Sequence, residues 1–107
     1  MKKNNGISLF RLLLLAGVSL AAISCSADGS ILFKEKGCIQ CHSFKGEGGR
    51  IGPDLTAVGD RLSASQIRNY IKNPSAKNSK ARMPSFSHLS TFEIWALASY
   101  LSNDEVK

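Results

Sequence analysis

Two stretches of the chain place apolar residues at helical spacing behind a helix-capping signal. The first reads LSASQIRNYIKNP and begins at Leu62. Ser63 and Gln66 form the Ser-x-x-Gln capping box that begins a helix, and the flanking Leu62 and Ile67 have the spacing of a hydrophobic staple. Pro74 cannot continue a helix and is expected to end it. The pattern therefore predicts a helix between Ser63 and Pro74.

The second stretch, LSTFEIWALASYL, repeats this arrangement near the carboxyl end of the chain. Ser90 and Glu93 form the capping box, and Leu89 and Ile94 form the staple. Its apolar positions fall on one side of a helix, which indicates an amphipathic helix packed on a core. The stripe consists of Ile94, Leu97, Ala98 and Leu101.

A third helix is expected from Asp28 to Lys36, in the segment DGSILFKEK. No stretch shows the alternation of apolar and polar residues that is typical of a strand. The sequence therefore predicts an all-α fold with three main helices.

The first 24 residues have the organisation of an export signal. Lys2, Lys3 and Arg11 make a positive leading segment, and an apolar segment follows at 12–23. Those twelve residues are short for a membrane span, which needs about 20. We predict that the signal, 1–24, is cleaved, with an uncleaved anchor helix as the alternative.

Cys25 ends the sequence LAAISC, which resembles the lipobox of a bacterial lipoprotein, although Ala22 stands where leucine is usual. Lipidation at Cys25 would tether the product to a membrane; the alternative is a free cysteine in a soluble product. The product, 25–107, is one small domain with eleven Lys and Arg and eight Asp and Glu. This excess of three positive charges, in an exported protein, gives no reason to expect nucleic-acid binding.

The pentapeptide from Cys38 to His42, with a second cysteine at Cys41, has three chemical interpretations. A thioredoxin-like redox pair requires a preceding strand in a βαβ unit, whereas the preceding segment looks helical. A structural zinc site requires four ligands, and the remaining candidates are His88 and Cys25, which adjoins the export signal. The third interpretation is covalent haem, because C-x-x-C-H is the attachment pattern for c-type haem.

The spacing favours haem. Residues three and four apart share one face of a helical turn, so the sulfurs of Cys38 and Cys41 can both reach the haem vinyl groups while His42 lies beneath the iron. An exported domain of this size also builds only a marginal apolar core and commonly needs a cofactor or another staple. We therefore expect one haem c, bound covalently by Cys38 and Cys41, with His42 as an iron ligand.

The chain from residue 25 onwards resembles a class I monohaem cytochrome c. The resemblance is carried by GSILFKEKGCIQCHSFKGEG, IGPDL, RMPSF and LSTFEIWALASYL. It implies a small fold of three main helices around one haem, with Met83 as the second axial ligand. It also implies that Gly52-Pro53 passes the proximal histidine, so that the Pro53 carbonyl accepts the Nδ1 proton of His42.

The resemblance further implies a close crossing of the first and last helices. The residues expected at the crossing are Gly29 and Phe33 on the first helix and Leu97 and Tyr100 on the last.

Met83 is the only methionine of the predicted product, which supports it as the axial ligand. His88 is the rival sixth ligand, and an open coordination site is the third possibility. With both axial positions filled, the iron can only exchange one electron. The chain is accordingly expected to be a monomeric electron carrier of the cell envelope and not an enzyme, with a small peroxidase or a fixed haem subunit or sensor as alternatives.

Between Arg61 and Phe92 the chain contains basic residues and no acidic residue. In a class I fold this segment wraps the methionine side of the haem, so it is expected to dock an acidic redox partner. The alternative is a solvated loop whose lysines only maintain solubility. The basic residues are Arg61, Arg68, Lys72, Lys77, Lys80 and Arg82.

Overall fold

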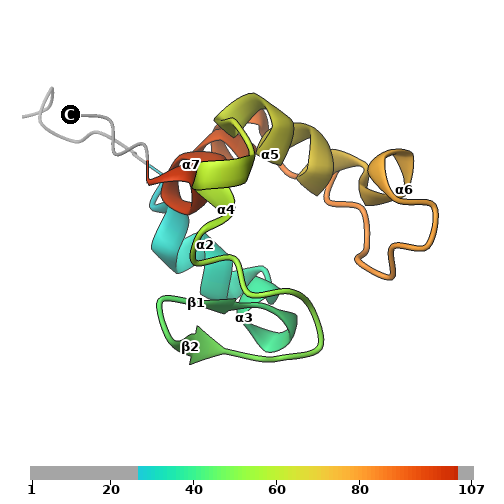
Figure 1. Cartoon of the computed structure of the whole chain (residues 1–107). Helices are drawn as coiled ribbons and strands as arrows, with labels where there is room; N and C mark the ends of the chain where they lie inside the picture. The colour runs from blue at the N-terminus through green and yellow to red at the C-terminus, as the bar shows by residue number, and fades with distance from the viewer. Residues whose placement is uncertain (1–26, 104–107) are drawn as a thin grey trace, which may run out of the picture.

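The computed structural model describes residues 27–103, which fold into short helices and one small hairpin (Figure 1). The predicted export signal and Cys25 lie outside these residues. The elements, in chain order, are α2 (Gly29–Glu35), α3 (Cys38–Cys41), β1 (Ser43–Phe44), β2 (Glu47–Gly48), α4 (Val58–Arg61), α5 (Ala64–Lys72), α6 (Pro74–Lys77) and α7 (Thr91–Ser102).

The three longest of these helices begin at side-chain caps, and two of these caps are the capping boxes that the sequence predicts. The side chain of Asp28 accepts a hydrogen bond from the backbone of α2. At α5, the Ser63 hydroxyl accepts from the Gln66 N–H at 3.2 Å, and the Gln66 side chain accepts from the Ser63 N–H at 2.9 Å. Ser90 and Glu93 make the same reciprocal pair at α7. Both predicted capping boxes are therefore confirmed.

Pro74 ends one helix and begins another. Helix α5 stops at Lys72, as predicted, and Pro74 is then the first residue of α6. A proline is well tolerated there, because the first N–H of a helix has no partner within the helix.

The expectation that the chain contains no strand is wrong at one place. Ser43–Phe44 pairs antiparallel with Glu47–Gly48. Lys45 and Gly46 join them with φ angles of 51° and 85°, the positive values that a two-residue hairpin turn of type I′ requires. Strands of two residues are too short to show alternation, so the turn, and not the hydrophobic pattern, specifies this hairpin.

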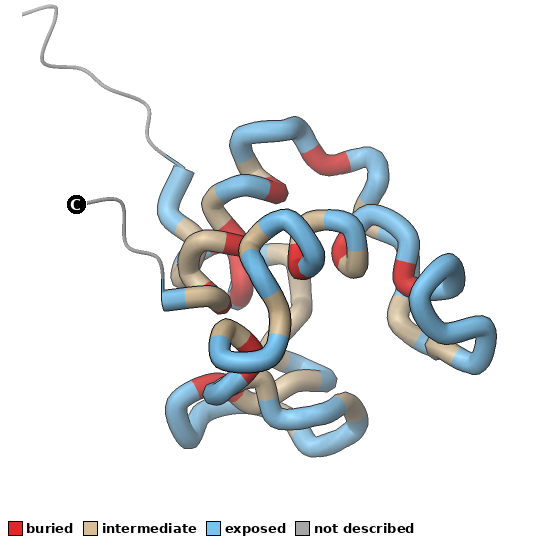
Figure 2. Tube along the Cα trace, turned by 45° about the horizontal axis from the view of Figure 1, so that its top comes forward, coloured by how far each residue is buried: buried red, intermediate tan, exposed pale blue. Residues whose placement is uncertain are grey.

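The described part of the chain carries its buried side chains around α7. Figure 2 shows that burial is scattered through the helices, whereas α6 and the loop that follows it, residues 78–88, are mostly exposed. Among the described residues, no helix has the length and apolar character needed to cross a membrane.

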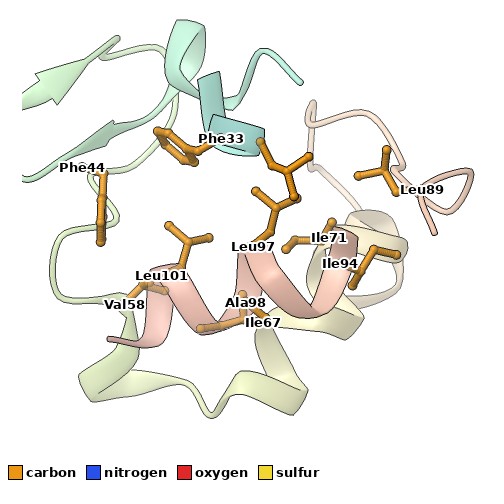
Figure 3. Close-up of a cluster of buried hydrophobic side chains, with 11 residues drawn as sticks. Phe33, Phe44, Val58, Ile67, Ile71, Leu89, Ile94, Leu97, Ala98 and Leu101 are labelled. Carbon is orange, nitrogen blue, oxygen red and sulfur yellow. The ribbon is translucent and has the colours of Figure 1, made fainter. Parts of the chain in front are cut away.

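Helix α7 packs against α2 on one side and α5 on the other (Figure 3). The predicted stripe of Ile94, Leu97, Ala98 and Leu101 is buried throughout. The other core residues are Leu32, Phe33, Phe44, Val58, Ile67, Ile71 and Leu89.

The crossing of α2 and α7 is as close as the resemblance implies. A Cβ atom at Gly29 would lie 2.3 Å from the backbone oxygen of Ala96 and 2.5 Å from the Cβ of Tyr100. One helical turn later, the rings of Phe33 and Tyr100 lie 6.0 Å apart between centroids. Any side chain at Gly29 would push the two helices apart, so glycine sets the distance between them.

Phe44 attaches the hairpin to this crossing. Its ring centroid lies 4.8 Å from that of Tyr100 and 6.1 Å from that of Phe33. The ammonium of Lys45 lies 5.2 Å from the centroid of Phe44 and adds a cation–π contact. Because β1 directly follows α3, this aromatic cluster also fixes the position of α3 relative to α7.

Candidate functional site

The two cysteines of the C-x-x-C-H motif stand on the single turn α3. Gly37 precedes the turn with a φ of 82°, a left-handed conformation that suits glycine. Cys38 is half-buried against the core, Cys41 is exposed, and both thiols are free. Burial raises the pKa of the Cys38 thiol. The turn thus presents two unpaired thiols at the spacing that thioether attachment requires.

The glycine-rich segment after the motif runs directly against α3. The Gly49 N–H donates to the Ile39 carbonyl at 2.8 Å, and the Gly52 N–H donates to the Cys41 carbonyl at 2.7 Å. A Cβ at Gly49 would lie only 2.0 Å from the Gln40 carbonyl oxygen. These contacts satisfy carbonyls that a one-turn helix leaves without partners of its own. The run of glycines after the motif is the sequence signal for these contacts, which were not among the predicted features.

His42 follows α3 and is oriented by the same segment. Its Nδ1 lies 2.8 Å from the Pro53 carbonyl oxygen. A carbonyl oxygen can only accept, so Nδ1 carries the proton and Nε2 keeps the lone pair that can bind a metal. The Gly52 backbone lies against the ring, where a Cβ would come within 2.7 Å of His42 Cε1. The contact expected between His42 and Pro53 is therefore present.

Met83 belongs to a different part of the molecule. It lies in the loop after α6, half-buried against the core. Figures 1 and 2 show this loop and α3 as separate parts of the molecule. The structure therefore gathers Cys38, Cys41, His42 and Pro53 around one turn and carries Met83 on a second segment.

The loop that carries Met83 is attached to the end of α5. The Phe86 N–H donates to the Ile71 carbonyl at 3.0 Å, and the Ser85 hydroxyl donates to the Lys72 carbonyl at 2.6 Å. Both acceptors belong to the last turn of α5, where carbonyls lack partners within the helix. Ser85 was missed by sequence reasoning, because nothing in its local pattern marks it.

His88, the rival ligand, is exposed on the same loop, with its ring 6.0 Å from that of Phe86. Met83 is thus the more buried of the two candidates. The sequence places no other methionine after the predicted signal.

The residues present fit a covalently bound haem. They offer two free thiols on one turn, an imidazole with Nε2 available, and a thioether on a separate loop. The competing interpretations find less support: helix α2, not a strand, precedes the motif, and residues 27–103 contain no group of three or more His, Cys, Asp or Glu placed to hold a metal ion.

Comparison with known families agrees with this chemistry. The sequence model of the family described as "Cytochrome c" matches residues 26–104. The chain belongs to the cytochrome c family. It is a class I monohaem cytochrome c with a small, mostly helical fold, and its haem c is covalent, with Cys38 and Cys41 in the expected positions.

Two curated relatives come from respiratory complexes. The cytochrome is 30% identical over 74% of its length to "Cytochrome c oxidase subunit 2" of Alkalihalophilus pseudofirmus. It is 38% identical over 60% of its length to the "Menaquinol:cytochrome c reductase cytochrome c subunit" of Bacillus subtilis. The match spans 25% and 22% of these relatives, so each is a much longer protein that contains a similar domain. The family and these relatives support electron transfer as the function.

We predict that Gly52→Ala will disturb the orientation of His42, because the added methyl carbon would lie 2.8 Å from Nδ1. Loss of the bond to Pro53 makes the imidazole a weaker electron donor, so the reduction potential of the cytochrome should rise. Overpacking should also destabilise the fold by about 1–3 kcal/mol. Redox titration and chemical denaturation measure the two effects.

The control is Ile51→Ala, at an adjacent side chain that is 87% exposed. It should change neither quantity measurably. A Gly52→Ala protein with the wild-type potential would contradict the orienting function of the contact.

Proposed function

We propose that this cytochrome is a one-electron carrier of the cell envelope, with His42 and Met83 as the axial ligands of its iron. The observation that carries the proposal is the His42–Pro53 bond, because a proton on Nδ1 leaves Nε2 of His42 with the lone pair that can bind a metal. Met83 is half-buried on a loop that Ser85 and Phe86 attach to α5. When bound, haem c supplies a one-electron couple between Fe(III) and Fe(II).

The proposed roles of four residues favour electron transfer over catalysis as the function. Cys38 and Cys41 hold the cofactor permanently, so it does not dissociate between reactions. With His42 and Met83 both bound to the iron, no coordination position would remain for a substrate. A peroxidase would require one of these positions to be open.

The names of the relatives support a place in a respiratory chain. One relative is named as part of a menaquinol:cytochrome c reductase and the other as part of a cytochrome c oxidase. We propose that a quinol-oxidising complex reduces this cytochrome and that a terminal oxidase or reductase oxidises it.

We predict that Met83→Ala will abolish the far-red sulfur-to-iron absorption band of the oxidised protein. The reduction potential should fall, because methionine ligation raises the potential of cytochromes c. The reduced variant should also bind carbon monoxide, which the wild-type protein should resist. Absorption spectroscopy and redox titration measure these changes.

His88→Ala is the matched control, on the same loop. It should leave the band and the potential unchanged. A band that survives Met83→Ala and disappears in His88→Ala would assign the sixth ligand to His88 instead.

We also propose that the export signal is removed and that Cys25 carries a diacylglycerol anchor on the outer face of a membrane. The support is the sequence LAAISC at the end of an apolar segment too short to span a bilayer comfortably. Lipidation would also modify the thiol of Cys25, the cysteine that haem attachment does not use.

Cys25→Ser is predicted to move the cytochrome from the membrane fraction to the soluble envelope fraction with its haem intact. Haem stain and absorption in the two fractions measure the change. Cys38→Ser is the contrasting variant, which should impair haem attachment instead. Unchanged membrane association of Cys25→Ser would indicate that the signal helix is retained.

A basic surface surrounds the loop that carries Met83. Lys72, Lys77, Lys80 and Arg82 are exposed on the end of α5, on α6 and on the following loop. Arg68 does not contribute to it in the same way, because its guanidinium lies over the ring of Trp95. Arg61, at the end of α4, is exposed as well. We propose that these five exposed residues steer an acidic redox partner toward the methionine side of the haem.

We predict that Lys77→Glu/Lys80→Glu slows electron exchange with the natural partner by about tenfold at low salt while leaving the potential nearly unchanged. Salt should weaken wild-type association, because surface charges are screened beyond about 8 Å at physiological ionic strength. Stopped-flow kinetics over a range of salt concentrations measure both effects. Lys34→Glu, an exposed charge reversal on α2, is the control. If electron exchange does not depend on salt and the double reversal leaves its rate unchanged, these lysines only maintain solubility.

A further inference from the structure

The outer side of α7 carries two exposed aromatic side chains. Phe92 is 81% exposed and Trp95 is 51% exposed. Residues three apart on a helix are neighbours on one face, and the face shared by Phe92 and Trp95 turns away from the centre of the buried stripe of α7. Exposed aromatic neighbours on a small domain indicate an interaction surface.

A positive charge accompanies the aromatic pair. The guanidinium carbon of Arg68, on α5, lies 3.8 Å from the centroid of the Trp95 ring. Lys72, one helical turn further along α5, is exposed. The adjacent carboxylate, Glu93, is paired with Lys36 at 3.2 Å. We call Phe92, Trp95 and Arg68 the α7 outer face; it combines two aromatic rings with a guanidinium that stacks on one of them.

The beginning of the folded domain lies beside the same helix. Gly29, the first residue of α2, contacts Ala96 and Tyr100 on α7. Cys25 precedes Gly29 by four residues, which span at most about 14 Å when extended. Along α7, Phe92 is about 12 Å from Tyr100. An anchor at Cys25 would therefore keep α7 close to the bilayer surface.

We propose that the α7 outer face rests on the anionic lipid headgroups of the membrane to which the cytochrome is tethered. Tryptophan prefers the membrane–water interface, and basic side chains are attracted to anionic lipids. The chemistry of the face comes from its own residues, while its closeness to the membrane rests on the anchor proposed at Cys25. Helix α2 leads from α7 to α3 (Figure 1), so the haem-binding turn lies at the end of α2 away from the anchor.

The test uses the haem-loaded Cys25→Ser protein, which has no lipid at that position. The protein is sedimented with vesicles rich in phosphatidylglycerol and with vesicles of phosphatidylcholine alone, and haem absorbance in the pellet measures binding. We expect binding to the anionic vesicles that decreases with added salt. Phe92→Ser/Trp95→Ser should lower the partition coefficient by at least about tenfold, because both rings lose their burial in the interface. Arg68→Gln should weaken binding to the anionic vesicles in particular.

Phe92→Leu/Trp95→Phe is the matched control, which keeps apolar bulk at both positions and should retain most of the binding. The haem spectrum and the thermal unfolding temperature of each variant confirm that the fold is unchanged. Absence of binding to either kind of vesicle would overturn the proposal, as would equal binding by the serine double variant. A serine double variant that binds vesicles normally but reacts slowly with its redox partner would assign the face to a protein instead, and this too overturns it.

Failure of the anchor is a separate result. It would be seen as unchanged fractionation of Cys25→Ser in cells, whereas the vesicle experiment compares variants of the α7 outer face that all carry the same Cys25→Ser change.

Discussion

The contact between the glycine-rich segment and α3 is the constraint on which the site depends. A helix of one turn cannot satisfy its own carbonyls, so the backbone of Gly49 and Gly52 supplies the missing donors. The approach leaves no space for a Cβ at either glycine. The same path brings the Pro53 carbonyl to His42, so one backbone segment both stabilises the turn and selects the tautomer of the histidine.

The helices hold this site in place through the crossing of α2 and α7. Gly29 allows the two backbones to meet. Beside this crossing, the rings of Phe33, Phe44 and Tyr100 pack against one another. Since α3 lies between α2 and the hairpin in the sequence, both of its ends are connected to this cluster. A rigid attachment at both ends suits a site that must keep a fixed geometry through many redox cycles.

The two proposed iron ligands depend on separate supports. His42 is held by the loop after α3, whereas the loop that carries Met83 is held by hydrogen bonds from Ser85 and Phe86 to the end of α5. Both supports join the core around α7, the first through α2 and the second through α5. Changes in the second loop can therefore alter the methionine side without disturbing the attachment of the cofactor at Cys38 and Cys41.

The sequence by itself determined the features that depend on residues close together in the chain. The capping boxes of α5 and α7 join residues three apart, and the C-x-x-C-H motif lies within one turn, so their geometry follows from local spacing. The mostly helical class followed from the three predicted helices, whereas the bond from His42 to Pro53 was expected from resemblance to the family. Only the tertiary structure decided the hairpin at Lys45 and Gly46, the attachment of Ser85 and the stacking of Arg68 on Trp95. The last two contacts join residues on different elements, which meet only once the chain has folded. The hairpin strands have two residues each, too few to show the hydrophobic alternation that would predict a strand.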